Sequence, residues 1–222
     1  MERGFAKRGA VDANFSRWQC KRVGKTADEF QQVTPTLYYW QAYEPSVKCD
    51  LSCCALITPA GMVFIDPIPL AAPSLKELTV LAKPAAVLLT NGNHARAAAD
   101  YRTRFGIPIF AHADAAQELG IALDGTLADG DTAPGGLRVV SLSGAAAGEI
   151  AFVGDGVVCV GDALIHVEPN GFAMLPAKYC ADARELARSL RKLLSFDAGI
   201  LTFAHGTPLT ANTQQRLTAL LA

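Results

Sequence analysis

The stretch that decides the fold is residues 55–66, ALITPAGMVFID, followed further along by residues 87–94, VLLTNGNH. In the first stretch, Pro59, Ala60 and Gly61 turn one apolar segment into another, which predicts two neighbouring strands. The apolar start of the second stretch predicts a buried strand. Leucines between about residues 72 and 82 have helical spacing, so the sequence predicts that a β then α alternation begins here.

Working outward from this stretch, the same signals predict further elements on both sides. Strands are expected at residues 36–43, 51–58, 107–111, 137–142, 149–153, 157–160 and 199–204. Helices are expected at residues 94–105, 113–119 and 210–221 and from Asp182 onward, where Asp182 and Glu185 have capping-box spacing. A strand-rich first half and a second half with the same rhythm predict an α/β protein with two sheets packed face to face and helices outside.

Composition bounds the class of protein. The chain has 222 residues, half of them hydrophobic, with 20 basic and 21 acidic side chains. We therefore expect one folded domain over residues 31–222, preceded by an extension over residues 1–30. The balanced charge gives no reason to expect nucleic acid or a membrane surface as partner. No apolar run approaches the roughly 18 to 20 residues that span a bilayer, and the start lacks a signal-peptide pattern, so a cytoplasmic location is expected.

The six cysteines are expected to be reduced thiols. Cys49, Cys53 and Cys54 lie close together in the sequence, but adjacent residues of a strand point to opposite faces. Small buried apolar residues are therefore a better interpretation of these cysteines than a metal cluster.

The order and spacing of four segments resemble the metallo-β-lactamase superfamily. The segments are residues 55–66, residues 87–94, Gly161-Asp162-Ala163 and residues 204–208, AHGTP. The resemblance covers about residues 33 to 210. It implies an αβ/βα four-layer sandwich of two mixed β-sheets with outer helices, and a metal site on loops at one edge of the sheets.

The resemblance also implies that most metal ligands have been replaced. The family pattern T-H-x-H-x-D-H supplies ligands for two metal ions, and residues 90–96 read TNGNHAR. Asn91, Asn93, Ala95 and Arg96 stand at the ligand positions. A further family histidine falls near Ala145, which has no ligand atom.

Two residues match the family's ligands. Asp162 corresponds to its bridging aspartate and His205 to its final histidine. A catalytic zinc generally has three protein ligands and an open position for water, and asparagine is a poor substitute for imidazole. We therefore expect no metal cofactor, with a weakly held single zinc as the alternative.

Removal of a dication would leave the Asp162 carboxylate without a counterion in a partly enclosed cleft. We expect the guanidinium of Arg96 to enter the vacated position and pair with Asp162. Asn91, Asn93, Arg96 and His166 are the predicted contacts for a bound ligand, because the resemblance places them at or near the rim of the cleft.

The remaining candidates have a plain interpretation and a functional one. His94 either packs in the first turn of a helix or acts as a base or ligand. His112 is expected to be a surface or capping residue. Asp66 is expected to support the loops by hydrogen bonding. Asp162, His205 and His94 are the candidate catalytic residues.

The function expected from these residues is a non-hydrolytic protein that binds a small molecule or a partner protein in the residual cleft. The alternative is a hydrolase of a thioester, lactone or phosphoester that uses one weak metal ion or none. Fold resemblance does not decide between them, so enzymatic activity stays open.

Overall fold

A computed structural model describes residues 25–169 and 171–222. Most of the predicted extension therefore lies outside the described residues, as does Cys20. The first described residues contact the domain, because Ala27 lies beside Leu70, donates to the backbone oxygen of Pro69 and accepts from the amide of Ala71.

The first half of the chain forms a seven-stranded mixed sheet in the order β1-β2-β3-β4-β5-β6-β7. The first four strands are antiparallel neighbours, whereas β4 to β7 run parallel. Its strands are β1 (Gln31–Gln32), β2 (Leu37–Glu44), β3 (Cys49–Thr58), β4 (Gly61–Ile65), β5 (Pro84–Leu88), β6 (Ile109–His112) and β7 (Gly125–Leu127).

The second half forms a five-stranded sheet in the order β14-β11-β10-β9-β8, in which only β11 and β14 are parallel. Its strands are β8 (Thr132–Ala133), β9 (Leu137–Ser141), β10 (Ile150–Gly154), β11 (Val157–Cys159) and β14 (Ile200–Thr202). A separate hairpin, β12 (Leu164–Val167) and β13 (Gly171–Met174), was not predicted.

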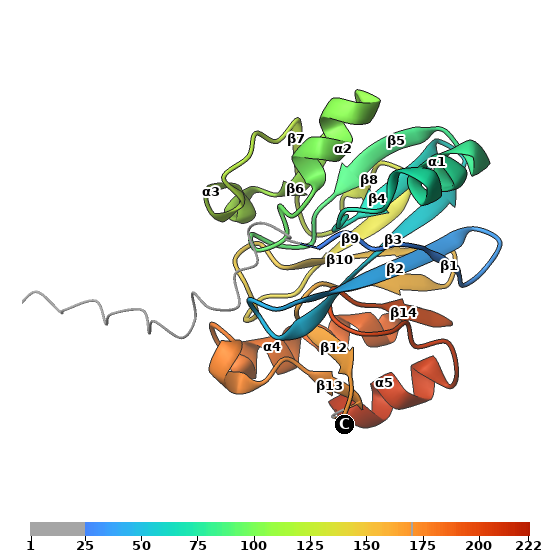
Figure 1. Cartoon of the computed structure of the whole chain (residues 1–222). Coiled ribbons are helices and arrows are strands. Elements are labelled where there is room, and N and C mark those ends of the chain that lie inside the picture. Colours follow the sequence, from blue (N-terminus) through green and yellow to red (C-terminus); the bar gives the residue numbers. More distant parts are fainter. Residues whose placement is uncertain (1–24, 170) are drawn as a thin grey trace, which may run out of the picture.

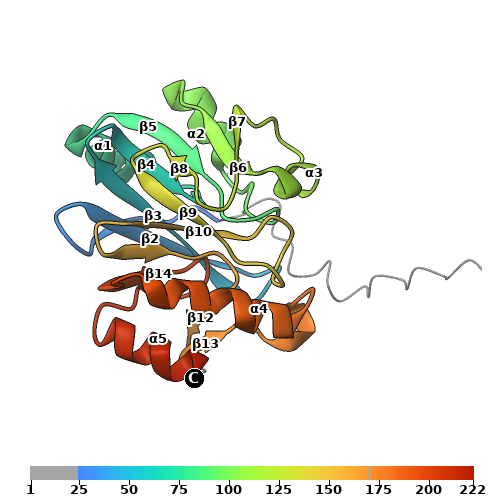
Figure 2. The ribbon, with the colours of Figure 1, turned by 180° about the vertical axis from the view of Figure 1, so that it is seen from behind.

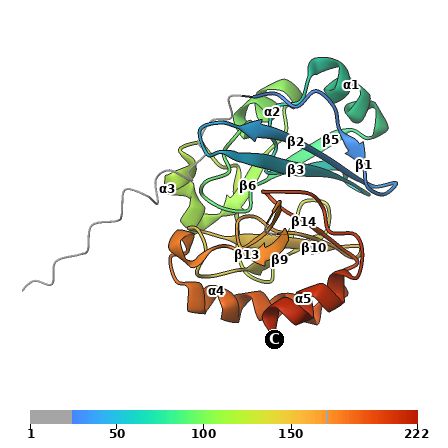
Figure 3. The same ribbon diagram turned by 60° about the horizontal axis from the view of Figure 1, so that its bottom comes forward.

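Helices cover the outer faces of both sheets, so the molecule has four layers (Figure 3). Helices α1 (Ala72–Leu81) and α2 (Ala98–Phe105) lie outside the seven-stranded sheet, and α4 (Ala183–Leu190) and α5 (Thr213–Leu221) outside the other (Figures 1 and 2). The short helix α3 (Ala116–Leu119) follows β6. Short 3₁₀ turns occupy Ala113–Ala115, Ala177–Tyr179 and Arg191–Ser195. The four-layer α/β sandwich is confirmed.

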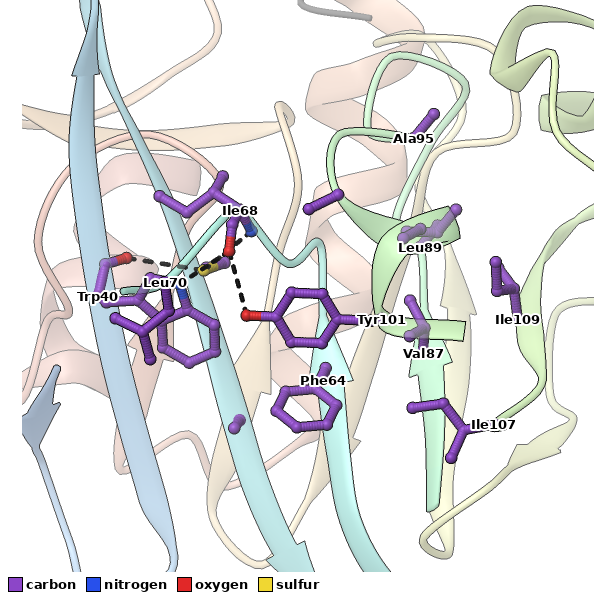
Figure 4. Close-up of a cluster of buried hydrophobic side chains, with 14 of the residues drawn as sticks. Trp40, Phe64, Ile68, Leu70, Val87, Leu89, Ala95, Tyr101, Ile107 and Ile109 are labelled. Carbon is purple, nitrogen blue, oxygen red and sulfur yellow. Dashed lines mark hydrogen bonds between the residues drawn. The ribbon is translucent and has the colours of Figure 1, made fainter. Parts of the chain in front are cut away.

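Three apolar clusters hold the layers together. One lies between α1, α2 and the seven-stranded sheet and includes Trp40, Phe64 and Tyr101 (Figure 4). The indole of Trp40 and the hydroxyl of Tyr101 both donate to the backbone oxygen of Ile68, which satisfies their polar atoms inside the core. A second cluster lies beneath α4 and α5, and a third between the sheets.

The prediction for Cys53 and Cys54 is confirmed. Cys53 packs in the cluster under the helices and Cys54 in the cluster between the sheets, on opposite faces of β3. The five cysteines among the described residues form no disulfide. None of the described helices combines the length and the apolar character needed to cross a membrane.

One predicted helix is wrong at its start. The helix expected from His94 begins at Ala98, and the preceding residues form an irregular loop. The backbone of Arg96 has a φ of 34°, which is not helical, and the amide of Ala97 donates to the oxygen of Pro67. Tertiary hydrogen bonds therefore replace the first helical turn.

Candidate functional site

The candidate site lies where strands of both sheets end. Asp66 follows β4 and residues 90–97 follow β5, and these two strands are parallel. Asp162 and His205 follow β11 and β14, which are also parallel. The carboxyl ends of these four strands thus meet at one edge of the sandwich, which brings together residues up to 139 positions apart in the chain (from 66 to 205).

His94 is held in one orientation by a carboxylate. Its Nδ1 lies 2.9 Å from Oδ2 of Asp66 and 2.9 Å from Oγ1 of Thr90. Asp66 also accepts hydrogen bonds from the backbone amide and the hydroxyl of Thr90, which confirms its expected supporting role. The Nε2 of His94 is therefore free to face Asp162, whose Oδ1 is 3.2 Å away.

His205 faces the same oxygen from the other sheet. Its Nδ1 lies 3.1 Å from the backbone oxygen of Asp50, and its Nε2 lies 3.2 Å from Oδ1 of Asp162. The turn behind it requires glycine, since a Cβ on Gly206 would lie 1.8 Å from the oxygen of His166 and the residue has a φ of 96°. We call His94, His205 and Oδ1 of Asp162 the histidine side of the site.

The other carboxylate oxygen of Asp162 faces two asparagines. The Nδ2 of Asn91 donates to Oε2 of Glu149 at 2.7 Å and to Oδ2 of Asp162 at 3.1 Å. The Nδ2 of Asn93 lies 3.3 Å from Oδ2 of Asp162. We call Asn91, Asn93 and Glu149 the amide side of the site. An amide nitrogen lies between the carboxylates of Glu149 and Asp162, so these groups do not provide a pocket for a cation there.

The predicted pairing of Arg96 with Asp162 is wrong. Arg96 is buried, but its guanidinium donates to the backbone oxygens of Ser52, Asp66 and Ala204, at 2.7, 3.3 and 3.2 Å. Within residues 25–169 and 171–222, the ion pairs of Asp162 are with His94 and His205. Arg96 thus joins backbone segments of both sheets. It does not take the place of a metal ion beside Asp162, because three backbone carbonyl groups accept its hydrogen bonds.

Burial and charge oppose each other on the histidine side. Burial lowers the pKa of His94, as does Arg96, but Asp66 and Asp162 together raise it above its ordinary value. Burial likewise lowers the pKa of His205, and its hydrogen bond to Asp162 raises it. Burial raises the pKa of Asp162, yet the two histidines hold it well below its usual range. This side is therefore an ion-paired cluster.

The amide side contains a carboxyl group, Glu149, whose pKa is raised. Burial, and then the charge of Asp162, raise the pKa of Glu149 well above its ordinary value. Its Oε1 accepts a hydrogen bond from the amide of Ala163. Glu149 was not predicted as a site residue. The only available signal was an acidic residue directly before a buried strand, where a charge is costly.

A pocket of about 740 Å³ opens beside this buried cluster. Its lining includes Asp50, His166 and Gly206, which adjoin His205, together with Lys48 and Tyr179. His166 is therefore at a cleft, whereas Asn91, Asn93 and Arg96 are buried and do not line this pocket. Their predicted contact with a ligand stays a prediction. His112 lies elsewhere and caps a 3₁₀ turn by accepting from the amide of Asp114, as expected.

The histidine side fits a single metal ion. Ligand atoms of His94, Asp162 and His205 all lie within 4.8 Å of one another. Each Nε2 lies 3.2 Å from Oδ1 of Asp162, close to the roughly 3.3 Å that separates two ligands of a tetrahedral zinc with bonds of about 2.0 Å. Asp66 fixes His94 through its other nitrogen, as carboxylates that accept from metal-binding histidines commonly do. The sequence matched Asp162 and His205 to ligand positions and left His94 as a possible base or ligand, and the structure brings all three together.

Comparison with known proteins gives one family. A family model described as the metallo-beta-lactamase superfamily matches residues 31–222. A search of curated proteins finds no match.

Solved structures of similar fold are metallo-β-lactamases. The enzyme from Pontibacter korlensis is 16% identical with a TM-score of 0.68, over 87% of this chain and 98% of its own. The DIM-1 metallo-β-lactamase is 12% identical with a TM-score of 0.70, over 89% and 98%. A metallo-β-lactamase from Erythrobacter litoralis is 16% identical with a TM-score of 0.66, over 86% and 95%. At these identities the likeness extends to the fold alone.

Proposed function

Since the chain belongs to the metallo-β-lactamase superfamily, we propose that it is a non-hydrolytic member that binds a small molecule or a partner protein beside an altered metal site. The observation that carries this proposal is the amide side of the site. Asn91 places an amide nitrogen between Glu149 and Asp162, and Ala145 is fully buried without a ligand atom. Among the described residues, this arrangement gives a second metal ion no ligand set next to Asp162.

The closure of the site supports the same proposal. His94, Asp162 and His205 are only 2%, 4% and 3% exposed. A catalytic metal keeps an open position for water and substrate, whereas a closed cluster stabilises the surrounding loops. The 740 Å³ pocket is large enough for a small organic molecule, and its lining combines lysine, tyrosine and histidine side chains with apolar ones.

A cytoplasmic location without nucleic-acid or membrane partners completes the proposal. The thiols of the described cysteines are unpaired, which is typical of a reducing compartment. The formal net charge is −1, which offers little attraction for a polyanion.

The second candidate is a hydrolase with one metal ion at the histidine side. The observation in its favour is the third ligand, His94, which brings the set to two imidazoles and one carboxylate. A divalent ion held there would supply Lewis acidity and lower the pKa of a bound water. The chain's own contribution is to orient His94 through Asp66 and to exclude bulk water.

Metal analysis combined with an activity screen separates the two candidates. Protein produced with zinc, manganese and iron is assayed for metal content and for ester, thioester, lactone and phosphoester hydrolysis, before and after chelation. We expect no chelator-sensitive turnover. Stoichiometric metal with turnover that disappears on chelation, and that His94→Gln abolishes while His112→Gln leaves it intact, would establish the hydrolase.

A thermal-shift screen tests the binding function directly. A ligand that binds only the native state raises the melting temperature by mass action. Compounds that raise the melting temperature of the wild type are expected not to raise that of His166→Ala, because His166 lines the pocket. The matched control is His112→Ala, which lies outside the lining. Hits that respond equally to both variants would place the ligand elsewhere.

A further inference from the structure

The two asparagines of the amide side differ in how well their polar atoms are satisfied. The Oδ1 of Asn91 accepts a hydrogen bond from the backbone amide of Asn93 at 2.8 Å, while its Nδ2 donates to Glu149 and Asp162. A reversed carboxamide would turn an amide group toward the amide of Asn93 and an oxygen toward two carboxylates. The orientation of Asn91 is therefore fixed, and it is a donor to the site.

Asn93 has no such anchor. It is 7% exposed, and its Oδ1 has no hydrogen-bond partner within the part of the chain that the structure describes. Its Nδ2 makes one long contact, 3.3 Å to Oδ2 of Asp162. A buried carbonyl oxygen without a donor is costly, and native proteins rarely leave one.

A half-turn of the Asn93 carboxamide exchanges its oxygen and nitrogen with almost no change of shape. The oxygen then lies beside the Asp162 carboxylate, about where Nδ2 lies now. Two oxygens at that distance repel each other unless a cation binds both. The same carboxylate is the centre of the three-ligand cluster with His94 and His205.

We propose that a divalent cation held by His94, His205 and the Asp162 carboxylate takes Oδ1 of Asn93 as a ligand from a fourth residue. The carboxylate joins the two parts of this set, because its Oδ1 faces the histidines and its Oδ2 faces Asn93. Asn93 contributes to the metal centre in this arrangement, whereas Asn91 does not. Four protein ligands leave no open position, which is the arrangement of a structural metal. A metal-loaded chain would then be closed to hydrolytic chemistry by its own side chain.

The ligand set of two imidazole nitrogens and two oxygens suits first-row divalent ions, with cobalt as a coloured probe for zinc-type sites. The experiment titrates metal-free full-length protein with Co²⁺ and records calorimetric affinity and the visible ligand-field absorption. The variants are Asn93→Ala and Asn93→Asp, with Gln117→Ala as a control because Gln117 is an exposed amide on α3.

We expect the wild type and Gln117→Ala to bind one Co²⁺ with the same affinity and spectrum. Asn93→Ala should bind roughly tenfold more weakly or worse, with an altered spectrum, because it loses a ligand. Asn93→Asp should melt at a lower temperature without metal, because it places a second carboxylate beside Asp162, and should gain more from Co²⁺ than the wild type does.

Equal affinity and spectrum for the wild type and a folded Asn93→Ala would overturn the inference, as would a wild type that binds no Co²⁺. Melting curves of the metal-free proteins show whether Asn93→Ala is folded. If Asn93→Ala is unfolded, the increase in melting temperature of Asn93→Asp on addition of Co²⁺ tests the inference instead. An increase no larger than that of the wild type would overturn it. The non-hydrolytic proposal fails on a different result, chelator-sensitive turnover, so the two failures are distinguishable.

Discussion

The histidine side and the amide side of Asp162 share one carboxylate but differ in what surrounds it. On the histidine side, two imidazoles with fixed orientation face Oδ1. On the amide side, neutral donors face Oδ2, and a neighbouring acid favours its neutral form. The difference shows that loss of metal ligands need not leave a buried charge unsatisfied. The histidine side retains the means to bind a cation, whereas Asn91 on the amide side bridges Glu149 and Asp162 with hydrogen bonds.

Asp162→Asn breaks both sides at once, so its effect should be the largest. It removes the charge that pairs with His94 and His205, and it leaves Asn91 facing an amide in place of one carboxylate oxygen. Loss of one partner of a buried ion pair typically costs about 4 kcal/mol. The free energy of unfolding is measured by urea denaturation, with the exposed Asp197→Asn as control. Equal losses in the two variants would mean that the cluster contributes nothing to stability.

Arg96→Ala tests whether Arg96 holds the two sheets together next to the site. The guanidinium donates to the oxygens of Ser52, Asp66 and Ala204. One hydrogen bond to a charged group contributes about 2.5 kcal/mol to the free energy of unfolding. The expected loss of unfolding free energy is of that size. In the control Arg102→Ala, loss of an ion pair with a partly exposed aspartate, Asp124, should cost less than about 1 kcal/mol. The urea midpoints of the two variants measure these losses. A smaller loss of stability in Arg96→Ala than in Arg102→Ala would refute the role of Arg96 in joining the two sheets.

Gly161→Ala should displace Thr90 and Glu149, which lie on either side of Gly161. A Cβ there would lie 2.3 Å from Oγ1 of Thr90 and 2.6 Å from Oε1 of Glu149. Overpacking of this kind costs about 1.5 kcal/mol, and it would disturb both Asp66 and the amide side. Gly199→Ala is the matched control, since its nearest atom, the oxygen of Gly156, lies at an ordinary 3.4 Å. Thermal melts in which both variants lose the same stability would show that the site tolerates the extra methyl.

Glu149→Gln should have the smallest effect, about 1 kcal/mol near pH 5, because the raised pKa already favours the neutral acid there and the substitution removes only one of its two acceptor oxygens. The unfolded chain releases this proton above about pH 4.3. The raised pKa in the folded chain therefore makes stability fall as the pH rises from there, and Glu149→Gln should flatten that fall. Urea midpoints at about pH 5 and about pH 8 measure the slope. An unchanged slope would mean that Glu149 ionises normally in the folded protein.

Much of the architecture follows from the sequence. The turn at residues 59–61 and the apolar runs around it fix β3 and β4, because hydrophobic periodicity is a local property. The capping residue Asp182 and the leucines after it fix α4 in the same way. Asp162 and His205 could be singled out by resemblance, since each lies beside a glycine in a short segment whose place in the chain matches the family pattern.

Only the tertiary structure decided the composition of the site. His94 began a helix according to local pattern, but the carboxylate of Asp66, 28 residues away, draws its ring toward Asp162. Glu149 gave almost no sequence signal, because its partner Asn91 lies on the other sheet's loops. Arg96 was expected beside Asp162, yet three backbone oxygens from both sheets bind it. Contacts between residues distant in the chain depend on how the two sheets meet, and no local pattern of residues records that arrangement.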